Sequence, residues 1–113
     1  MVRKTEKIFK ALGEKNRLRI INMLMARPMC VCEITDVLNL SQSTVSGHLK
    51  ILKETDIIED TKEGLWVEYS LAKRVEANKP IFKFLRTLFD EDPLLIGERK
   101  SALAADREVL CGK

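Results

Sequence analysis

The feature that most constrains the fold is a pair of amphipathic helical patterns separated by very few residues. After Pro28, apolar residues recur near the helical period of 3.6 and run to Asn39, a residue suited to a helix C-terminus. Ser41, a favourable N-cap, then begins a second pattern over residues 42–55 that no proline interrupts. Two such helices joined by a turn of about three residues predict a helix-turn-helix.

The second of these helices has two different sides. The side predicted to face the core holds Val45, His48, Leu49, Ile51 and Leu52, and the opposite side is short, polar and basic. Small side chains let a helix backbone lie deep in the major groove of DNA, whereas lysines mainly contact phosphates. On composition alone, an ordinary amphipathic helix with a solvated face stays an open alternative. The predicted DNA-contacting residues are Ser41, Gln42, Ser43, Thr44, Ser46, Gly47, Lys50, Lys53 and, from the hairpin that follows, Lys62.

The remaining patterns complete a mainly α fold with a β-hairpin wing. Upstream, we expect a first helix of about two turns that ends at Gly13, and a second that begins after Asn16 as N-cap and ends before Pro28. Downstream, the extended runs 57–61 and 65–71 flank a glycine-containing turn and predict the two-stranded wing. The apolar face of 65–71 is expected to pack on the helices. C-terminal helices are predicted over 81–89 and about 94–110.

Length and composition fit a soluble globular chain of 113 residues, 45% hydrophobic and 33% charged. We expect a winged helix-turn-helix domain over residues 1–92 and a C-terminal helical tail over 93–113 that contributes to a dimer or a sensing site. No apolar run of membrane-spanning length and no signal peptide pattern occurs, so we expect a cytoplasmic protein without a membrane partner. The net charge of +3 permits nucleic-acid binding without demonstrating it.

Cys30 and Cys32 form a close pair in a chain with no predicted export signal, which favours metal or redox chemistry over a structural disulfide. We place both in the first turn of the helix after Pro28. Side chains two apart on a helix point about 200° apart, so one ion would bind both only if that turn unwound. Unwinding would disturb the adjoining DNA-contacting helix and weaken DNA binding by linkage. An enzyme is not expected, because there is no second histidine, cofactor loop or paired carboxylate cluster.

Three segments resemble the ArsR/SmtB family of metal-responsive repressors: residues 41–52, residues 11–13 with 16–21, and wing residues 64–71. The resemblance covers roughly residues 5 to 90. It implies a homodimer paired mainly through its first and last helices, which binds an imperfect palindrome in operator DNA without a required cofactor. The motif Cys30-Val31-Cys32-Glu33 resembles the signature of the arsenic-responsive branch, which implies arsenite or antimonite as inducer. Trivalent arsenic prefers three sulfur ligands, and thiolates select soft ions.

The third sulfur ligand has several candidate sources. The positions after Cys32 hold no further cysteine, so Cys111 of the same or the partner subunit is one candidate. The alternatives are an incidental thiol at Cys111 and a small-molecule thiol such as glutathione. A cadmium or lead sensor, a redox or persulfide sensor of the same fold, and a protein-binding adaptor stay open as rival functions.

Three further positions carry specific expectations. His48, the one histidine, is expected to be a packed, hydrogen-bonded residue rather than a metal ligand. Gly47 and Asp56 depart from the family pattern. A glycine inside a helix costs roughly 1 kcal/mol against alanine, so Gly47 bears on which bases are read. Asp56 replaces a frequent glycine before the first wing strand, which places the local turn geometry in question.

Overall fold

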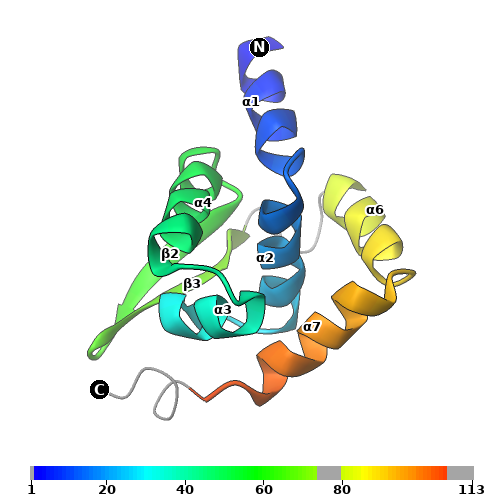
Figure 1. The fold of residues 1–113 in the computed structure, drawn as a ribbon. Coiled ribbons are helices and arrows are strands. Elements are labelled where there is room, and N and C mark those ends of the chain that lie inside the picture. Colours follow the sequence, from blue (N-terminus) through cyan, green and yellow to red (C-terminus); the bar gives the residue numbers. More distant parts are fainter. Residues whose placement is uncertain (1, 74–79, 107–113) are drawn as a thin grey trace.

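The computed structural model describes residues 2–73 and 80–106 and confirms a mainly α fold with a β-hairpin wing (Figure 1). Within these residues the elements are α1 (Val2–Leu12), α2 (Lys15–Ala26), β1 (Met29–Cys30), α3 (Val31–Leu38), α4 (Gln42–Glu54), β2 (Ile58–Glu63), β3 (Trp66–Leu71), α6 (Pro80–Phe89) and α7 (Pro93–Ala104).

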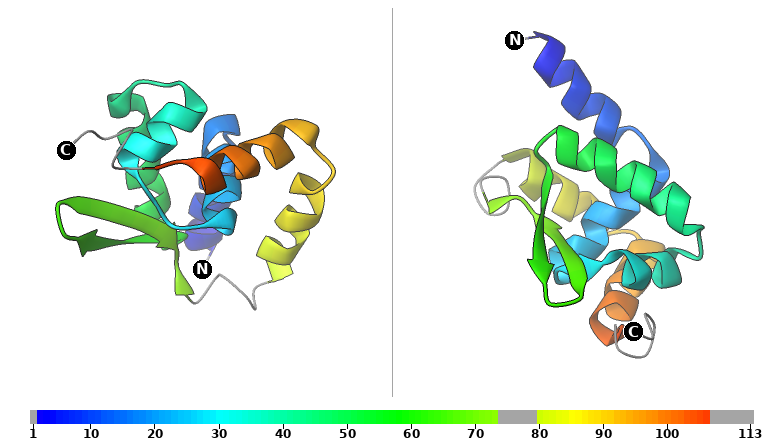
Figure 2. Two further views of the ribbon diagram at one scale, coloured as in Figure 1. Left: turned by 90° about the horizontal axis from the view of Figure 1, so that it is seen from below. Right: turned by 90° about the vertical axis from the view of Figure 1, so that its left-hand side faces the viewer.

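The central helix is α2, which lies between α3, α4 and the sheet on one side and α6 and α7 on the other (Figures 1 and 2). Its predicted N-cap, Asn16, is wrong by two residues. The cap is Glu14, whose carboxylate accepts hydrogen bonds from the backbone N–H groups of Asn16 at 2.7 Å and Arg17 at 3.0 Å. The preceding helix α1 is also one turn longer than expected, because it continues outward to Val2.

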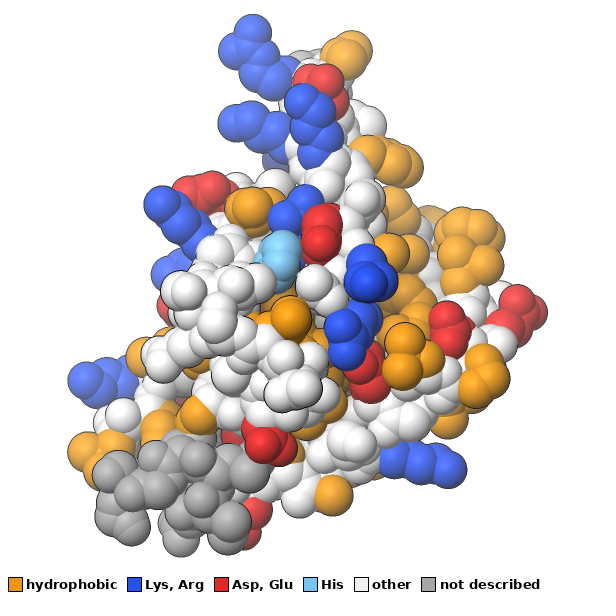
Figure 3. Space-filling view, in the orientation of Figure 1, with side chains coloured by type: hydrophobic (Ala, Val, Ile, Leu, Met, Phe, Trp, Pro, Cys, Tyr) orange, Lys and Arg blue, Asp and Glu red, His pale blue; other side chains and the backbone are white. Residues whose placement is uncertain are grey.

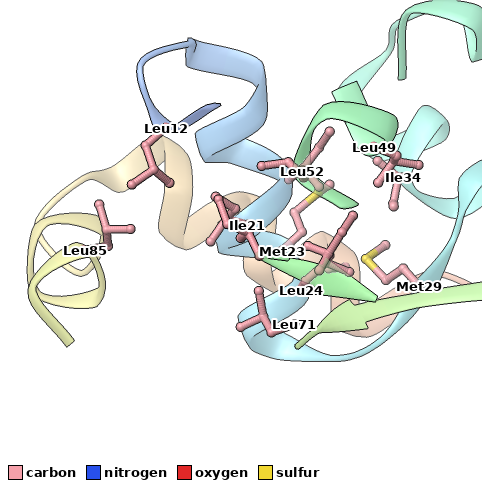
Figure 4. Packing of buried hydrophobic residues seen from close by; sticks show 14 of the residues in the cluster. Leu12, Ile21, Met23, Leu24, Met29, Ile34, Leu49, Leu52, Leu71 and Leu85 are labelled. Atoms are coloured by element: carbon pink, nitrogen blue, oxygen red, sulfur yellow. The ribbon is translucent and has the colours of Figure 1, made fainter. Parts of the chain in front are cut away.

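The hydrophobic core lies where α2 meets α3, α4 and the sheet (Figure 4). Each of these elements contributes side chains that are almost completely buried. Ile51 was predicted to join them but is 39% exposed, because it lies at the border of the polar side of α4. The largest buried apolar side chains of this core are Ile20, Ile21, Met23, Met29, Ile34, Leu49, Leu52 and Ile58.

The sheet has three antiparallel strands in the order β1-β3-β2, rather than the two expected. Strand β1 pairs with β3 through Met29 opposite Tyr69 and Cys30 opposite Glu68. Two residues are too few to show the alternation by which a strand is recognised in a sequence. The third strand therefore ties the cysteine segment to the middle of β3 in the wing.

The wing projects from the body of the protein. Its turn contains Gly64 with a φ of +61°, as expected for the glycine between the strands. Leu71, at the base, is buried, but Leu65, at the tip, is 84% exposed. The predicted packing of the 65–71 face on the helices therefore holds only at the base, because the hairpin extends beyond the body.

Helix α7 packs along α2 through polar contacts. Asn22 is completely buried and donates from Nδ2 to the Leu95 carbonyl at 2.8 Å, and Arg19 donates from Nε to Glu98 at 2.9 Å. The helix begins at Pro93 after the Asp92 cap and ends at Ala104, earlier than the predicted end near residue 110. Among the described residues, no helix is long and apolar enough to cross a membrane.

Candidate nucleic-acid interface and cysteine site

The polar side of α4 is presented to solvent as a continuous face. Every predicted contact residue from Ser41 to Lys53 is exposed, and so is Lys62 on the wing. Ser41 is the N-cap, as expected: its hydroxyl accepts from the Thr44 N–H at 3.2 Å and donates to the Thr44 hydroxyl at 2.8 Å. Asn39 ends α3 in the left-handed conformation, with a φ of 57°, which allows the short turn into α4. On the opposite side, the core-facing residues of α4 are buried, so the polar face is held toward solvent.

Gly47 lies in the middle of the exposed face. A β-carbon built there meets no atom within 4 Å, so neither packing within the chain nor backbone conformation requires glycine. Asp56 behaves differently, since its φ of +61° lies in the region that favours glycine. The aspartate therefore keeps the turn geometry at a conformational cost, because side chains other than glycine adopt this region less readily.

Lys53 of α4 is paired with a carboxylate of the wing. The Nζ of Lys53 lies 2.9 Å from Asp60 on β2, and the hydrogen bond and negative charge of that carboxylate raise the pKa of Lys53. The pair is exposed, so it contributes little to stability. It marks the edge of α4 that faces the wing.

His48 is packed and hydrogen-bonded, as predicted. Its side chain is 15% exposed, with Nδ1 3.2 Å from the Arg17 guanidinium and Nε2 3.9 Å from Glu14. Burial alone would raise the pKa of Glu14, but the hydrogen bonds from the Arg17 and Asn16 N–H groups outweigh it, aided by the charges of His48 and Arg17. The pKa of Glu14 is therefore lowered from its ordinary value of 4.5.

The two cysteines of the pair occupy different surroundings. Cys30 was predicted to lie in the first turn of α3, and this is wrong. It is the N-cap of α3, with an extended backbone (φ −87°, ψ 162°) and 2% exposure. Cys32 is half-buried within that first turn and is disulfide-bonded, whereas Cys30 is not in a disulfide. The two are therefore not joined to each other, in agreement with the strain expected of such a short link.

A buried carboxylate connects the cysteine segment to the rest of the protein. Glu33 is completely buried, and its Oε1 accepts from the Cys30 N–H at 2.8 Å. Its Oε2 accepts from Arg27 Nη2 at 2.9 Å. The same guanidinium donates from Nη1 to the Ala102 carbonyl at 2.9 Å and the Ala105 carbonyl at 3.3 Å. One chain of hydrogen bonds thus runs from the cap of α3 to the end of α7.

The predicted three-cysteine site has two members among the described residues. Cys111 lies outside these residues. Within 2–73 and 80–106, no three His, Cys, Asp or Glu side chains gather closely enough to hold a metal ion. Cys30, and Cys32 once its disulfide is reduced, would supply the soft sulfur donors that trivalent arsenic and other thiophilic ions prefer.

Comparison with known proteins agrees with this arrangement. Residues 14–60 match the bacterial regulatory protein, arsR family. The chain is 46% identical over 67 residues to the uncharacterized HTH-type transcriptional regulator MJ1325 of Methanocaldococcus jannaschii, which covers 58% of this chain and 75% of that protein. The chain belongs to the ArsR/SmtB family.

Two further relatives of this family member are informative. It is 40% identical over 72 residues to the arsenical resistance operon repressor of Bacillus subtilis, which covers 63% of this chain and 69% of the relative. The homodimeric winged helix-turn-helix DNA-binding domain Mb0332 of Mycobacterium bovis has the same fold, with a TM-score of 0.70 and 26% identity over 80% of this chain and 82% of that domain. Each of these three names is that of a regulator or a DNA-binding domain.

Sequence reasoning about this ArsR-family protein missed the Arg27–Glu33 pair. In the sequence, Arg27 indicates only the end of a helix before Pro28. Glu33 appears only as the last residue of the motif Cys30-Val31-Cys32-Glu33. A glutamate three residues after a helix cap is a recognisable capping signal. Its burial and its contact with Arg27 depend on how α7 covers α2, which no local pattern contains.

Proposed function

We propose that this protein is a transcriptional repressor that binds operator DNA as a homodimer, with α4 in the major groove. The observation that supports this most strongly is the division of α4, in which Val45, Leu49 and Leu52 are buried while the polar and basic side is uncovered along its whole length. Ser43, Ser46 and Gly47 would allow close approach, Gln42 would read a base edge, and Lys50, Lys53 and the wing's Lys62 would contact phosphates. Ser41 and Thr44 would lie at the end of the helix nearest the DNA backbone.

The proposed dimer would be formed by the outer helices. Phe9 on α1 is 61% exposed, and Phe84 and Leu88 on α6 are 61% and 46% exposed. Phe84 and Leu88 are four residues apart and so lie on one side of α6, and exposed apolar side chains of this size favour burial against a partner. A two-fold dimer would place its two α4 helices on half-sites about 34 Å apart, one turn of DNA. We further propose, on the grounds of the sequence, that residues 93–113 contribute to this dimer or to the sensing site.

We propose arsenite or antimonite as the inducer, bound by the thiolates of Cys30, Cys32 and Cys111. The similarity to an arsenical resistance operon repressor and the chemistry of thiolates support this choice. Because Cys32 is disulfide-bonded in the structure, ion binding would require the reduced protein. An ion would also reach Cys30 only if the start of α3 opened, since that side chain is almost completely buried.

The position of Cys30 suggests how ion binding would weaken DNA binding. Cys30 is the cap of α3, the partner of Glu68 on β3, and the donor to Glu33. Drawing its sulfur toward an ion would therefore disturb α3, the wing and the Arg27 link to α7 together. This replaces the earlier expectation that the ion unwinds a turn holding both cysteines. A thousandfold loss of DNA affinity corresponds to roughly 4 kcal/mol of coupling.

Fluorescence anisotropy on the DNA upstream of the protein's own gene tests this function. The reduced protein should bind this fragment. Arsenite or antimonite should release it at lower concentrations than cadmium, lead or zinc. Release by cadmium or lead alone would identify the rival ion sensor. Cys111→Ser should weaken the arsenite response, and an unchanged response would exclude the three-cysteine site. Failure to bind operator-length DNA at low salt would instead favour a protein-binding adaptor.

A thiol redox sensor is the second candidate, because Cys32 is disulfide-bonded in the structure. Its release from DNA would follow oxidation by peroxide or sulfane sulfur and reverse with dithiothreitol. Arsenite under reducing conditions would then have no effect. The same anisotropy assay therefore separates the two candidates.

A further inference from the structure

The N-terminal helix α1 carries a basic face that the proposed recognition surface does not include. Arg3, Lys7 and Lys10 are spaced four and three residues apart, so they lie on one side of the helix, and all three are exposed. We call these three residues the basic face of α1. The exposed apolar residues Val2 and Phe9 are seven positions apart, which places them together on another side. Figure 3 shows basic and hydrophobic side chains on different sides of this helix. The helix is thus divided between a basic and an apolar surface.

Electrostatics single out this helix. Four basic residues and one acidic residue give α1 a formal charge of +3, which equals the net charge of the whole chain. The remaining residues therefore carry as many acidic as basic side chains. A surplus of positive charge confined to one short helix produces a local positive potential that attracts a polyanion. The net charge of the whole chain does not by itself show that the surplus positive charge lies on α1.

The basic face lies beside α4. Lys7 and Lys10 line a surface pocket of about 300 Å³ together with Ile51 and Glu54 of α4 and its C-cap, Thr55. The helix is held there by Arg17, which donates from Nε to the Ala11 carbonyl at 2.7 Å and also lines the pocket. The exposure of Ile51, which the sequence did not predict, belongs to this junction.

Helix α4 is consequently flanked on two edges. The wing lies along one edge, where Lys53 contacts Asp60, and α1 lies beside the C-terminal end of the other, where Ile51 and Thr55 meet the pocket. The exposed polar side containing Gly47 and Lys50 lies between the two edges. A helix that enters the major groove has a phosphate backbone on each side of it. The wing would face one of these strands, and the basic face of α1 would face the other.

We infer that the basic face of α1 contacts DNA phosphates on the side of α4 opposite the wing. The inference rests on the proposed function of α4 and assigns the protein a second, sequence-independent contact surface. Phosphate contacts raise affinity for all sequences alike and fix the register of the recognition helix. Glu6, which lies 3.6 Å from Lys10 in an exposed pair, would be displaced toward solvent when a phosphate takes its place.

The test is the salt dependence of DNA binding by Lys7→Gln/Lys10→Gln. A plot of log K against log salt has a negative slope, and each lost phosphate contact makes it less steep by about 0.9. Losing two lysines from each of the two protomers should therefore make it less steep by about 3.6. The affinity at low salt should fall roughly tenfold or more on specific and random DNA alike. Lys83→Gln/Arg86→Gln, at two exposed positions of α6, removes the same charge away from α4 and, with an unchanged dimer mass, should keep the wild-type slope.

The outcomes separate the two ideas. A wild-type slope in Lys7→Gln/Lys10→Gln, with normal circular dichroism and dimer mass, would overturn the inference and leave the function of α4 intact. An equal loss of slope in the control variant would also overturn it, since only long-range charge would then be acting. If the wild-type protein failed to bind DNA even at low salt, the proposed function would fail together with the inference.

Discussion

Gly47→Ala distinguishes a glycine required by DNA from one that is merely tolerated. An internal helix glycine costs roughly 1 kcal/mol against alanine, and a methyl group at this position meets no atom within 4 Å. The substitution should therefore stabilise the free protein by about 1 kcal/mol. With an unfolding entropy of about 2.1 cal/mol/K per residue, 113 residues convert this gain into a rise in Tm of about 4 °C.

The DNA-bound protein should respond in the opposite direction. If the α4 backbone approaches a base edge at position 47, the added methyl group should weaken DNA binding by roughly 1–3 kcal/mol, or about fivefold to 150-fold. Thermal unfolding at fixed protein concentration and anisotropy at fixed salt measure the two effects. Gly97→Ala is the matched control, because Gly97 lies inside α7, is exposed, and also has no atom within 4 Å of a built β-carbon.

Gly97→Ala should raise Tm by a similar amount and leave the DNA affinity unchanged. Equal DNA affinities for both variants and the wild type would refute close approach at Gly47. A rise in Tm for Gly97→Ala but not for Gly47→Ala would refute the reasoning about open space.

Three further predictions concern stability and assembly. Glu14→Gln should lower the free energy of unfolding by about 0.5–1 kcal/mol at pH 7. Because the folded-state pKa of Glu14 is lowered, its ionic contribution is present above pH 4.5 and is lost as pH falls through that pKa, so urea titrations of the two proteins should converge in acid. Arg27→Gln should cost about 3 kcal/mol by leaving the buried carboxylate of Glu33 unpaired, and Arg27→Gln/Glu33→Gln should recover most of it in the same titration. Leu88→Glu should shift sedimentation toward monomer at micromolar concentration, whereas Leu65→Glu at the wing tip should leave the dimer mass unchanged.

The elements with strong local signals were predicted from the sequence. Ser41 caps α4, Asn39 ends α3 in the left-handed conformation, and Gly64 has the positive φ expected between the wing strands. Each of these depends on the conformational preferences of one or two residues, which act within a single turn. The helical period likewise identified Val45, Leu49 and Leu52 as core residues, because a helix has only one buried side here.

Other features depended on neighbours distant in the sequence. Cys30 pairs with Glu68 on β3, and this pairing makes it an extended cap rather than a helical residue. Ile51 fits an apolar pattern, yet it lies at the junction with α1, where the core does not extend. No period within the α4 segment could show where α1 would lie.

The sequence alone thus determined the helix-turn-helix, the wing and the presence of a thiol pair, because spacing and side-chain type act locally. The tertiary structure decided what those elements touch. It buried Glu33 between Cys30 and Arg27, and it brought the lysines of α1 beside α4. The Glu33 contact with Cys30 is a local capping contact, but the burial of that carboxylate and the place of α1 beside α4 follow from how whole helices pack rather than from the preferences of any one segment.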